Sequence, residues 1–272
     1  MIQLTPDQYN TVAPLLEPLQ DHLAVPAALA GLIPAAVYAD APDHPGLALL
    51  HARHRLYLAG APGSAPPVQS IRALFQNTLR PQAQAAGQEM FTLWLAPAGW
   101  AEPVREALAA LRPGLGRRHY YTFQSLRPDW RSGLPPEFTL QAVNATLLAQ
   151  ASLAGLDDLR AEMCSERPSV DAFLAQSFGV CLTRDDTLAG WCLSEYNIPG
   201  ACEIGIETRA AWRRRGLATV MTCAFVETAL THGVTRIGWD CWANNQPSIA
   251  TALKAGFEKI HDDLVIYGWF NA

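Results

Sequence analysis

The chain has 272 residues, of which 50% are hydrophobic and 17% are charged, and its formal net charge is -5. This composition excludes global disorder and provides length for one large or two modest globular domains. The mildly acidic balance argues against nucleic acid as the main partner and is compatible with a cationic substrate such as an amine.

The sequence contains no recognisable targeting or membrane segment. The amino terminus, MIQLTPDQYN, has neither a basic leader nor an apolar run, so we expect no signal peptide. No stretch approaches the roughly 20 uninterrupted apolar residues of a membrane helix. The six cysteines are scattered singly, without a CxxC pair, which favours buried thiols in a reducing cytoplasm over a metal site. We expect a cytoplasmic protein without a metal, and both monomer and homodimer stay open.

The first half of the chain predicts an α/β domain. Its expected elements are strands over residues 35–40, 47–53 and 54–60, a helix over about 68–84, a strand over 90–96, a helix over 101–112 and a strand over 119–123. A Pro/Gly-rich polar stretch over 126–138, LRPDWRSGLPPEF, then separates two regions of different texture. We predict domains over 1–130 and 131–272.

The second half is easier to interpret. Asn144 or Thr146 is expected to cap a helix that Pro168 ends after about Arg167, and Asp185 and Asp186 are turn residues of a β-hairpin. The expected elements are a strand over 138–143, helices over about 144–167 and 170–176, the hairpin over 179–198, a strand over 201–208, a helix over about 215–231, a strand over 236–242, a helix over 247–255 and a last strand over 263–270. The same order of hairpin, helix, strand, helix and strand occurs in both halves, which suggests either a degenerate internal duplication or an unrelated α/β cap.

The stretch RRRGLATVMTCAFVETAL, residues 213–230, concentrates positive charge where a helix is expected to begin. A helix N-terminus presents unpaired amide groups and the positive end of the dipole, and arginines beside it add charge-assisted bonds to phosphate oxygens. Gly216 allows close backbone approach, and Ala218 keeps the first turn open. The alternative is a solvated basic helix start.

The context of this turn favours a ligand. Arg213-x-x-Gly216-x-Ala218, after the strand CEIGIET, resembles the coenzyme A signature of the GNAT N-acetyltransferase superfamily. WDCWANNQPSIATALKAGFEK, residues 239–259, resembles the second signature of that family, an Asn after a strand, a short helix and then Lys-x-Gly-Phe. The combination more narrowly resembles a bacterial branch that includes the zwittermicin A resistance acetyltransferase. Neither signature occurs in the first half.

The resemblance implies an α/β (α+β) fold, a C-terminal mixed twisted sheet with flanking helices whose two central strands, over 201–208 and 236–242, splay apart to admit acetyl-CoA. The smaller N-terminal α/β domain would then be a degenerate GNAT-like repeat or a cap. The resemblance also implies a set of residues at the acetyl-CoA site. These are Ile206, Glu207 and Thr208 on the strand, Arg213, Arg214, Arg215, Gly216, Leu217, Ala218 and Thr219 at the turn, and Asn245 and Ser248 beside the pantetheine arm.

Acetyl transfer to an amine needs a proton acceptor, for which Glu203, Glu207 and Glu195 are the candidates. Glu203 is the first choice because of its expected place at the splay. A strand carboxylate is also commonly solvent-facing or ion-paired, so none of the three is fixed by the sequence.

The acid that would protonate the leaving thiolate is not assigned. Many family members carry a tyrosine in the second helix, where this chain has Ala252. Tyr196, Tyr267 and solvent are the alternatives. Trp242 is a candidate wall for an acceptor pocket, while His232 and His261 are expected at the surface.

Three functions follow as expectations. The first is acetyl transfer from acetyl-CoA to a primary amine of a small molecule, an antibiotic or a metabolite. The second is transfer to a protein or peptide amine, and the third is a coenzyme A-binding module without catalysis. A covalent acyl intermediate on Cys241 is disfavoured, since a lone cysteine on a strand is usually structural.

Overall fold

The computed structural model of the protein describes residues 1–61 and 63–271. The chain divides into two compact units, which are described separately below. Unit 1 comprises Met1–Arg118 and Asp262–Ala272, and unit 2 comprises His119–His261. Within the described residues no helix is long and apolar enough to cross a membrane.

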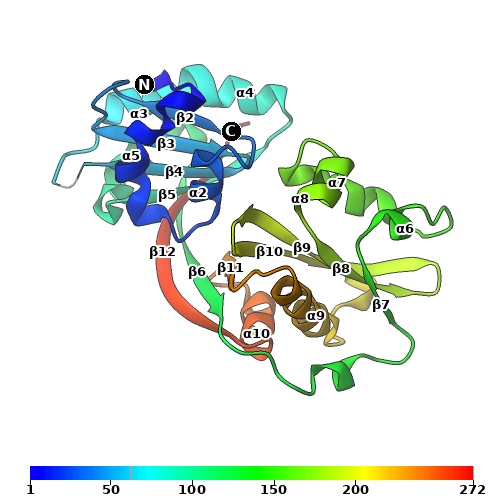
Figure 1. Ribbon diagram of the computed structural model, residues 1–272. Coiled ribbons are helices and arrows are strands. Elements are labelled where there is room, and N and C mark those ends of the chain that lie inside the picture. Colours follow the sequence, from blue (N-terminus) through cyan, green and yellow to red (C-terminus); the bar gives the residue numbers. More distant parts are fainter. Residues whose placement is uncertain (62, 272) are drawn as a thin grey trace. The chain divides into compact units, whose positions relative to one another are not determined.

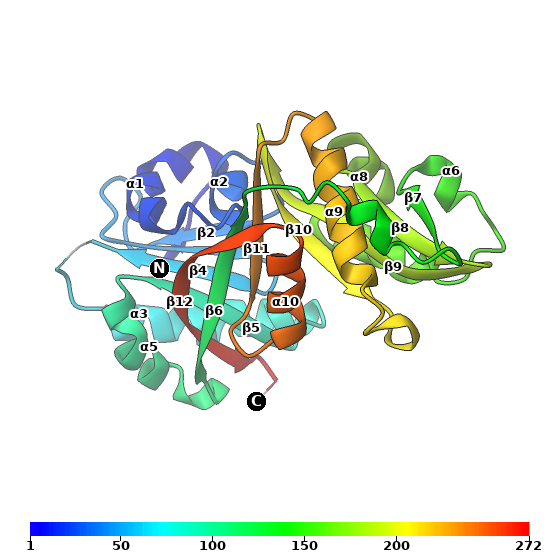
Figure 2. The ribbon, with the colours of Figure 1, turned by 90° about the horizontal axis from the view of Figure 1, so that it is seen from below.

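Unit 1 is a mixed sheet with helices on both faces (Figures 1 and 2). Its strand order is β1-β2-β3-β4-β5-β12. Strands β4 and β5 are parallel, while the pairs β1–β2, β2–β3, β3–β4 and β5–β12 are antiparallel. The strands are β1 (Ile2–Gln3), β2 (Ala36–Ala39), β3 (Leu47–Ala52), β4 (Arg55–Gly60) and β5 (Met90–Ala96), and the helices are α1 (Ala13–Leu16), α2 (Ala24–Leu29), α3 (Val68–Leu74), α4 (Arg80–Ala85) and α5 (Ala101–Ala107). A π-helical segment, Phe75–Leu79, joins α3 to α4.

The strands of unit 2 are also mixed in direction and follow the order β6-β11-β10-β9-β8-β7. Strands β10 and β11 are parallel, and β7 to β10 form an antiparallel meander. The strands are β7 (Thr139–Ala142), β8 (Gly179–Arg184), β9 (Thr187–Ile198), β10 (Ala201–Thr208) and β11 (Arg236–Trp242), and the helices are α6 (Ala145–Leu148), α7 (Leu156–Glu166), α8 (Val170–Gln176), α9 (Leu217–Thr231) and α10 (Gln246–Lys254).

Two strands, β6 (Gly114–Phe123) and β12 (Phe257–Trp269), continue from one unit into the other. The end of β12 pairs antiparallel with β5 and so completes the sheet of unit 1, although it is the last strand of the sequence. The end of β6 lies next to β11 in the sheet of unit 2. Each half of the sequence therefore gives its last strand to the sheet that the other half builds.

The two faces of the unit 2 sheet pack against different helices. On one face, Ile237, Trp239 and Cys241 of β11 join a core with α9, and Ile204 and Ile206 of β10 pack against it. On the other face, Trp191 and Leu193 of β9 join a core with α7 and α8. Because side chains alternate along a strand, Glu203, Gly205 and Glu207 lie on the face opposite α9.

The mixed α/β class with a twisted mixed sheet and flanking helices is confirmed, and the repeated order of elements is present in both units. The single helix predicted over 144–167 is wrong: α6 ends at Leu148, and α7 begins only after Gly155, whose φ of 96° interrupts helical geometry. Asn144 is the cap of α6, since its side chain accepts a hydrogen bond from the Leu147 amide at 2.9 Å. The stretch expected to link two domains, 126–138, lies inside unit 2, and domains over 1–130 and 131–272 stay a prediction.

Candidate functional site

The parallel strands β10 and β11 separate after a short paired segment. Their register joins Ala201 with Arg236, Cys202 with Ile237 and Glu203 with Gly238, and no later residue of either strand is paired with the other. Strand β10 nevertheless continues to Thr208 and β11 to Trp242. The edge of β10 that faces β11 therefore carries backbone N–H and C=O groups without a ladder partner from Ile204 onward, which suits hydrogen bonding to an inserted ligand.

Helix α9 begins at a turn that holds two residues in the left-handed region. Arg214 has a φ of 63° and Gly216, the N-cap, has a φ of 78°. The first intrahelical bond runs from the Val220 amide to the Gly216 carbonyl at 3.3 Å, and no side chain caps the helix. The amides of Leu217, Ala218 and Thr219 thus have no intrahelical acceptor, and they point out of the helix end that carries positive partial charge.

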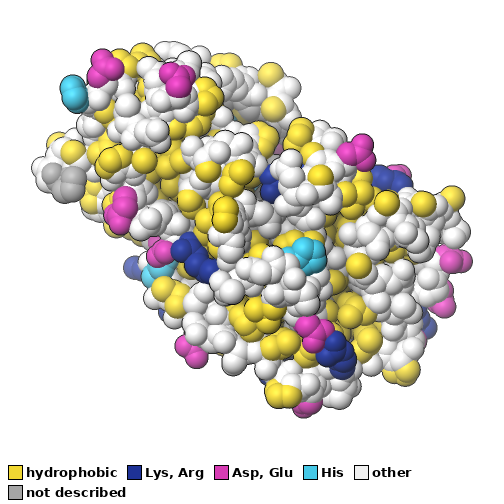
Figure 3. Space-filling view, viewed as in Figure 1, with side chains coloured by type: hydrophobic (Ala, Val, Ile, Leu, Met, Phe, Trp, Pro, Cys, Tyr) yellow, Lys and Arg dark blue, Asp and Glu magenta, His cyan; other side chains and the backbone are white. Residues whose placement is uncertain are grey.

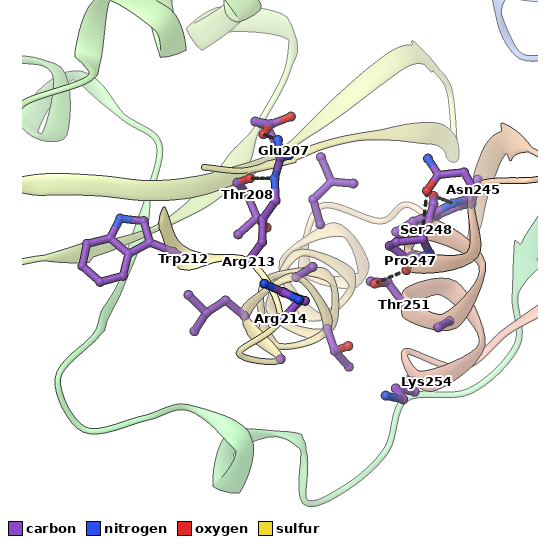
Figure 4. A pocket seen from close by; sticks show the side chains of 17 residues that line it. Glu207, Thr208, Trp212, Arg213, Arg214, Asn245, Pro247, Ser248, Thr251 and Lys254 are labelled. Carbon is purple, nitrogen blue, oxygen red and sulfur yellow. Dashed lines mark hydrogen bonds and ion pairs between the residues drawn. The ribbon is translucent and has the colours of Figure 1, made fainter. Parts of the chain in front are cut away.

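A cleft of about 780 Å³ lies between the end of β10, the start of α9 and helix α10 (Figure 4). It is lined by Ile206, Glu207, Thr208, Trp212, Arg213, Arg214, Gly216, Leu217, Ala218, Thr219, Trp239, Asn245, Pro247, Ser248, Ala250, Thr251 and Lys254. Every residue that the resemblance assigned to the acetyl-CoA site lines this cleft except Arg215, whose guanidinium lies over the Trp212 ring at 5.2 Å. The site assignment itself stays a prediction.

The charges around the cleft differ in their partners. Arg213 is held inside the site, because it donates to the Thr208 carbonyl at 2.8 Å and to the Glu207 carboxylate at 2.9 Å (Figure 4). Arg214 and Lys254 form no ion pair or hydrogen bond through their side chains within residues 1–61 and 63–271. A second hollow of about 270 Å³, also lined by Gly216 and Lys254, adds Arg127, whose Nε lies 4.0 Å from the carboxylate of Asp129 in the same hollow, so Arg127 is partly compensated while Arg214 and Lys254 are not. Uncompensated cations beside a helix N-terminus fit a polyphosphate.

Helix α10 presents polar groups to the same cleft. Asn245 caps the helix, since its side-chain oxygen accepts from the Ser248 amide at 3.2 Å. The Ser248 hydroxyl oxygen in turn accepts from the Trp239 indole Nε1 at 3.1 Å. Asn245 therefore has a structural role as a cap, and its amide NH₂ group bonds no other described residue.

The candidate bases occupy distinct positions. Glu203 is 1% exposed and belongs to the last paired position before β10 and β11 separate. Glu195 of β9 is its direct cross-strand neighbour, and the Glu195 carboxyl covers Gly205, where an added Cβ would meet Oε1 at 1.9 Å. Glu207 is engaged by Arg213 at 2.9 Å. These observations favour Glu203 for proton transfer and give Glu207 the role of holding Arg213.

A local bulge in β9 lies next to the pair formed by Glu203 and Glu195. Between the pairs Ala201–Ile198 and Glu203–Glu195, β9 has one residue more than β10, and Tyr196 in the bulge has a φ of 49°. Such bulges re-aim side chains and are common beside active sites. The sequence offers no signal for this feature, because a tyrosine at positive φ is rare.

Tyr120 was not among the predicted site residues, yet it lies beside Glu203. A Cβ added to Gly238 would meet the Tyr120 hydroxyl at 2.3 Å and Glu203 Cγ at 3.1 Å, so both side chains cross the same glycine. His261, expected alone at the surface, stacks on Tyr120 with ring centroids 5.2 Å apart. Only the sheet order could reveal this grouping, since Tyr120, Glu203 and Gly238 come from three strands.

Neither of the two tyrosines predicted as alternatives for the acid lines the cleft. Ala252 is fully buried in the core beneath α10. Tyr196 is 1% exposed in the bulge, and Tyr267 belongs to the part of β12 in unit 1. Among the residues that do line the cleft, Ser248 and Thr251 carry hydroxyl groups on α10, and the Thr251 hydroxyl donates to the Pro247 carbonyl at 2.9 Å.

The buried thiols are unsuited to covalent catalysis. Burial raises the pKa of Cys181 to about 12 and of Cys223 to about 11, and it raises the pKa values of Cys192 and Cys202 as well. The thiolate is the nucleophilic form, so these groups stay protonated at neutral pH. Cys241 packs in the core beside α9.

We expect iodoacetamide at about pH 8 to alkylate the native protein once, at Cys164, because the reactive thiolate is scarce below a raised pKa and only Cys164 is exposed. Labelling of the buried thiols should increase only when the pH approaches their raised pKa values. Peptide mass spectrometry locates the label, and denatured protein, which should take six labels, is the control. Rapid native labelling of Cys202 or Cys241 would contradict this arrangement.

A family model described as GNAT acetyltransferase matches residues 13–265. The chain belongs to this family. Membership places it among acetyltransferases, whose family typically uses acetyl-CoA, and the family model covers both halves of the sequence although the two signatures occur only in the second.

The GNAT chain also has similar relatives among known proteins. It is 22% identical over 266 residues to an uncharacterized N-acetyltransferase, YdfB, of Bacillus subtilis (strain 168), with 97% of each chain covered. A GCN5-related N-acetyltransferase-like protein from Streptococcus suis 89/1591 matches with a TM-score of 0.73 and 19% identity over 97% of this chain and 98% of its own. A tandem GNAT protein from the clavulanic acid biosynthesis pathway matches with a TM-score of 0.58 and 14% identity over 99% and 98%. These likenesses show that the fold is shared.

Proposed function

We propose that the protein is an N-acetyltransferase that moves the acetyl group of acetyl-CoA to a primary amine of a small molecule, and that unit 2 carries the site. The observation that carries this proposal is the cleft between β10, α9 and α10, where free helix amides meet the uncompensated cations Arg214 and Lys254. We place its action in the cytoplasm of a bacterium, where buried thiols persist.

The cleft residues fit coenzyme A in three parts. The amides of Leu217, Ala218 and Thr219 and the Arg214 guanidinium suit the pyrophosphate. Lys254 and Arg127, which line the adjoining hollow, suit the phosphorylated nucleotide end. The unpaired edge of β10 from Ile204 to Thr208 offers backbone groups to the pantetheine amides and to the acetyl carbonyl.

The separation of β10 and β11 supports a direct transfer. Ile206 lies toward α9, and Glu203 lies on the opposite face at the point where the strands part. An amine entering from the Glu203 face would meet an acetyl group held in the gap. Glu203 then accepts the ammonium proton, the amine nitrogen attacks the thioester carbonyl carbon, and the C–S bond breaks with the electron pair passing to sulfur.

The acceptor side is rich in groups that attract cations. Glu203 and Glu195 are adjacent there, and alternation along β11 puts Asp240 and Trp242 on the same face as Gly238. On the face drawn in Figure 3, basic and acidic side chains lie scattered and mixed, which is not the electrostatic footprint of a nucleic-acid binder. We propose an amine antibiotic or amine metabolite as acceptor, and membership of the zwittermicin A resistance branch stays part of this proposal.

The test is thiol release from acetyl-CoA by the purified protein across a panel of amines that includes zwittermicin A, polyamines, aminoglycosides and peptides with a free N-terminus. Turnover with a small amine supports the proposal. Turnover with peptides alone would establish the protein-acceptor alternative. Binding of acetyl-CoA without turnover on any amine would favour the non-catalytic module.

We further expect one acetyl-CoA per chain, although both units share the GNAT-like order of elements. In unit 1, β4 and β5 stay paired from Arg55–Thr92 to Ala59–Ala96, so they form no gap over this segment. The Trp100 ring covers Gly60, where an added Cβ would lie 1.9 Å from Cη2. Helix α3 begins after Pro67 rather than after a glycine turn. Calorimetric titration measures the stoichiometry, and two equal sites per chain would show that unit 1 also binds.

A further inference from the structure

The Ser248 hydroxyl is held in an unusual arrangement in the cleft wall. Its oxygen accepts a hydrogen bond from the Trp239 indole at 3.1 Å, and indole Nε1 is a donor only. Trp239 is 3% exposed and packs against Phe257 with ring centroids 5.6 Å apart, so the indole is fixed. Ser248 thus acts as acceptor toward the core.

The proton of the Ser248 hydroxyl is therefore available to a ligand. A serine hydroxyl has one O–H to donate and two lone pairs, and the Ser248 O–H donates to no group within residues 1–61 and 63–271. Ser248 lines the cleft together with Trp239. The bond from Trp239 also draws electron density from the oxygen and strengthens the O–H as a donor.

We infer that Ser248 is a catalytic residue that donates a hydrogen bond to the sulfur of coenzyme A as the thiolate leaves, and that Trp239 is the residue that positions it. This inference rests on the proposed function. When the C–S bond breaks, sulfur takes the electron pair, and Ser248 keeps its proton while its O–H stabilises the negative charge. The attacking nitrogen loses a proton as the amide forms, and the thiolate afterwards takes up that proton or one from water, so no serine alkoxide forms.

The inference has a readout that needs no acceptor. A donor that faces the sulfur lowers the pKa of the bound thiol, and the thiolate form then binds more tightly than the thiol. A free thiol has a pKa of about 8.5. Between about pH 7 and about pH 9.5, the affinity of the wild-type protein for coenzyme A should therefore rise about tenfold relative to desulfo-coenzyme A, which lacks the sulfur.

The experiment is calorimetric titration with coenzyme A and desulfo-coenzyme A at both pH values, on the wild type, Ser248→Ala, Trp239→Phe and Thr251→Ala. Ser248→Ala should abolish the rise with pH in the affinity for coenzyme A relative to desulfo-coenzyme A. Trp239→Phe should reduce this rise severalfold. Thr251→Ala should keep it, because that hydroxyl is already bonded to the Pro247 carbonyl. Where an acceptor has been found, Ser248→Ala should lower kcat about tenfold with the KM for acetyl-CoA unchanged, and Ser248→Thr should restore part of the rate.

The outcomes distinguish a failure of the proposed function from a failure of the role given to Ser248. Failure of the wild type to bind either compound would overturn the proposed function. Equal pH dependence for both compounds in the wild type, or an unchanged advantage in Ser248→Ala, would overturn the role of Ser248 and leave the cofactor site standing.

Discussion

Replacing Gly216 with glutamate is expected to abolish binding of acetyl-CoA. The glycine is the N-cap of α9, and a Cβ there would point into open space that is part of the cleft. A carboxylate would lie at the proposed pyrophosphate site beside the helix amides, and such like-charge juxtaposition costs several kcal/mol, or a loss of affinity of at least about a hundredfold. Calorimetric titration with acetyl-CoA measures this loss.

The chain offers a matched control at the other end of the same helix. Gly233 has a φ of 76°, close to the 78° of Gly216, and also has open space around its missing Cβ. Gly233→Glu imposes the same backbone strain, about 1 to 2 kcal/mol, but lies outside the cleft lining. It should lower the Tm of the protein to a similar degree and keep full binding. If Gly216→Glu also kept its affinity, the turn would not be the phosphate site.

The glycine turn could be predicted because its signal is local. A strand, a basic glycine turn and a long apolar helical segment follow one another in the sequence, and the structure builds β10, the turn and α9 in those places. The hairpin over 179–198 is likewise local, with its turn at Asp185, which has a φ of 50°. Periodicity and turn chemistry are sufficient for such elements.

The features that the sequence did not reveal depend on pairing between distant segments. The end of β12 pairs with β5, more than a hundred residues earlier, and hydrophobic alternation carries no information about the partner strand. The meeting of Tyr120 and Glu203 at Gly238 depends on the order of three strands in the same way. The first thirty residues were missed for another reason, since their short helices α1 and α2 have too few turns for a periodic signal.

Replacing Glu203 with glutamine is expected to lower kcat by about a hundredfold to ten thousandfold, the range typical for loss of a general base. Glutamine keeps the shape of the side chain, so the packing of this residue, which is 1% exposed and lies over Gly238, is preserved. In the proposed arrangement acetyl-CoA lies on the α9 side of the gap, so its KM should change little. Steady-state kinetics with an active amine measures both constants.

Glu207→Gln is the matched comparison, because it changes the same kind of side chain on the same strand face. Glu207 is bonded to Arg213, which also binds the Thr208 carbonyl at the cleft. Its loss should loosen Arg213 and raise the KM for acetyl-CoA, with a smaller effect on kcat than Glu203→Gln has. The opposite split, with kcat lost in Glu207→Gln and retained in Glu203→Gln, would move the proton acceptor from the point where β10 and β11 part to the mouth of the cleft.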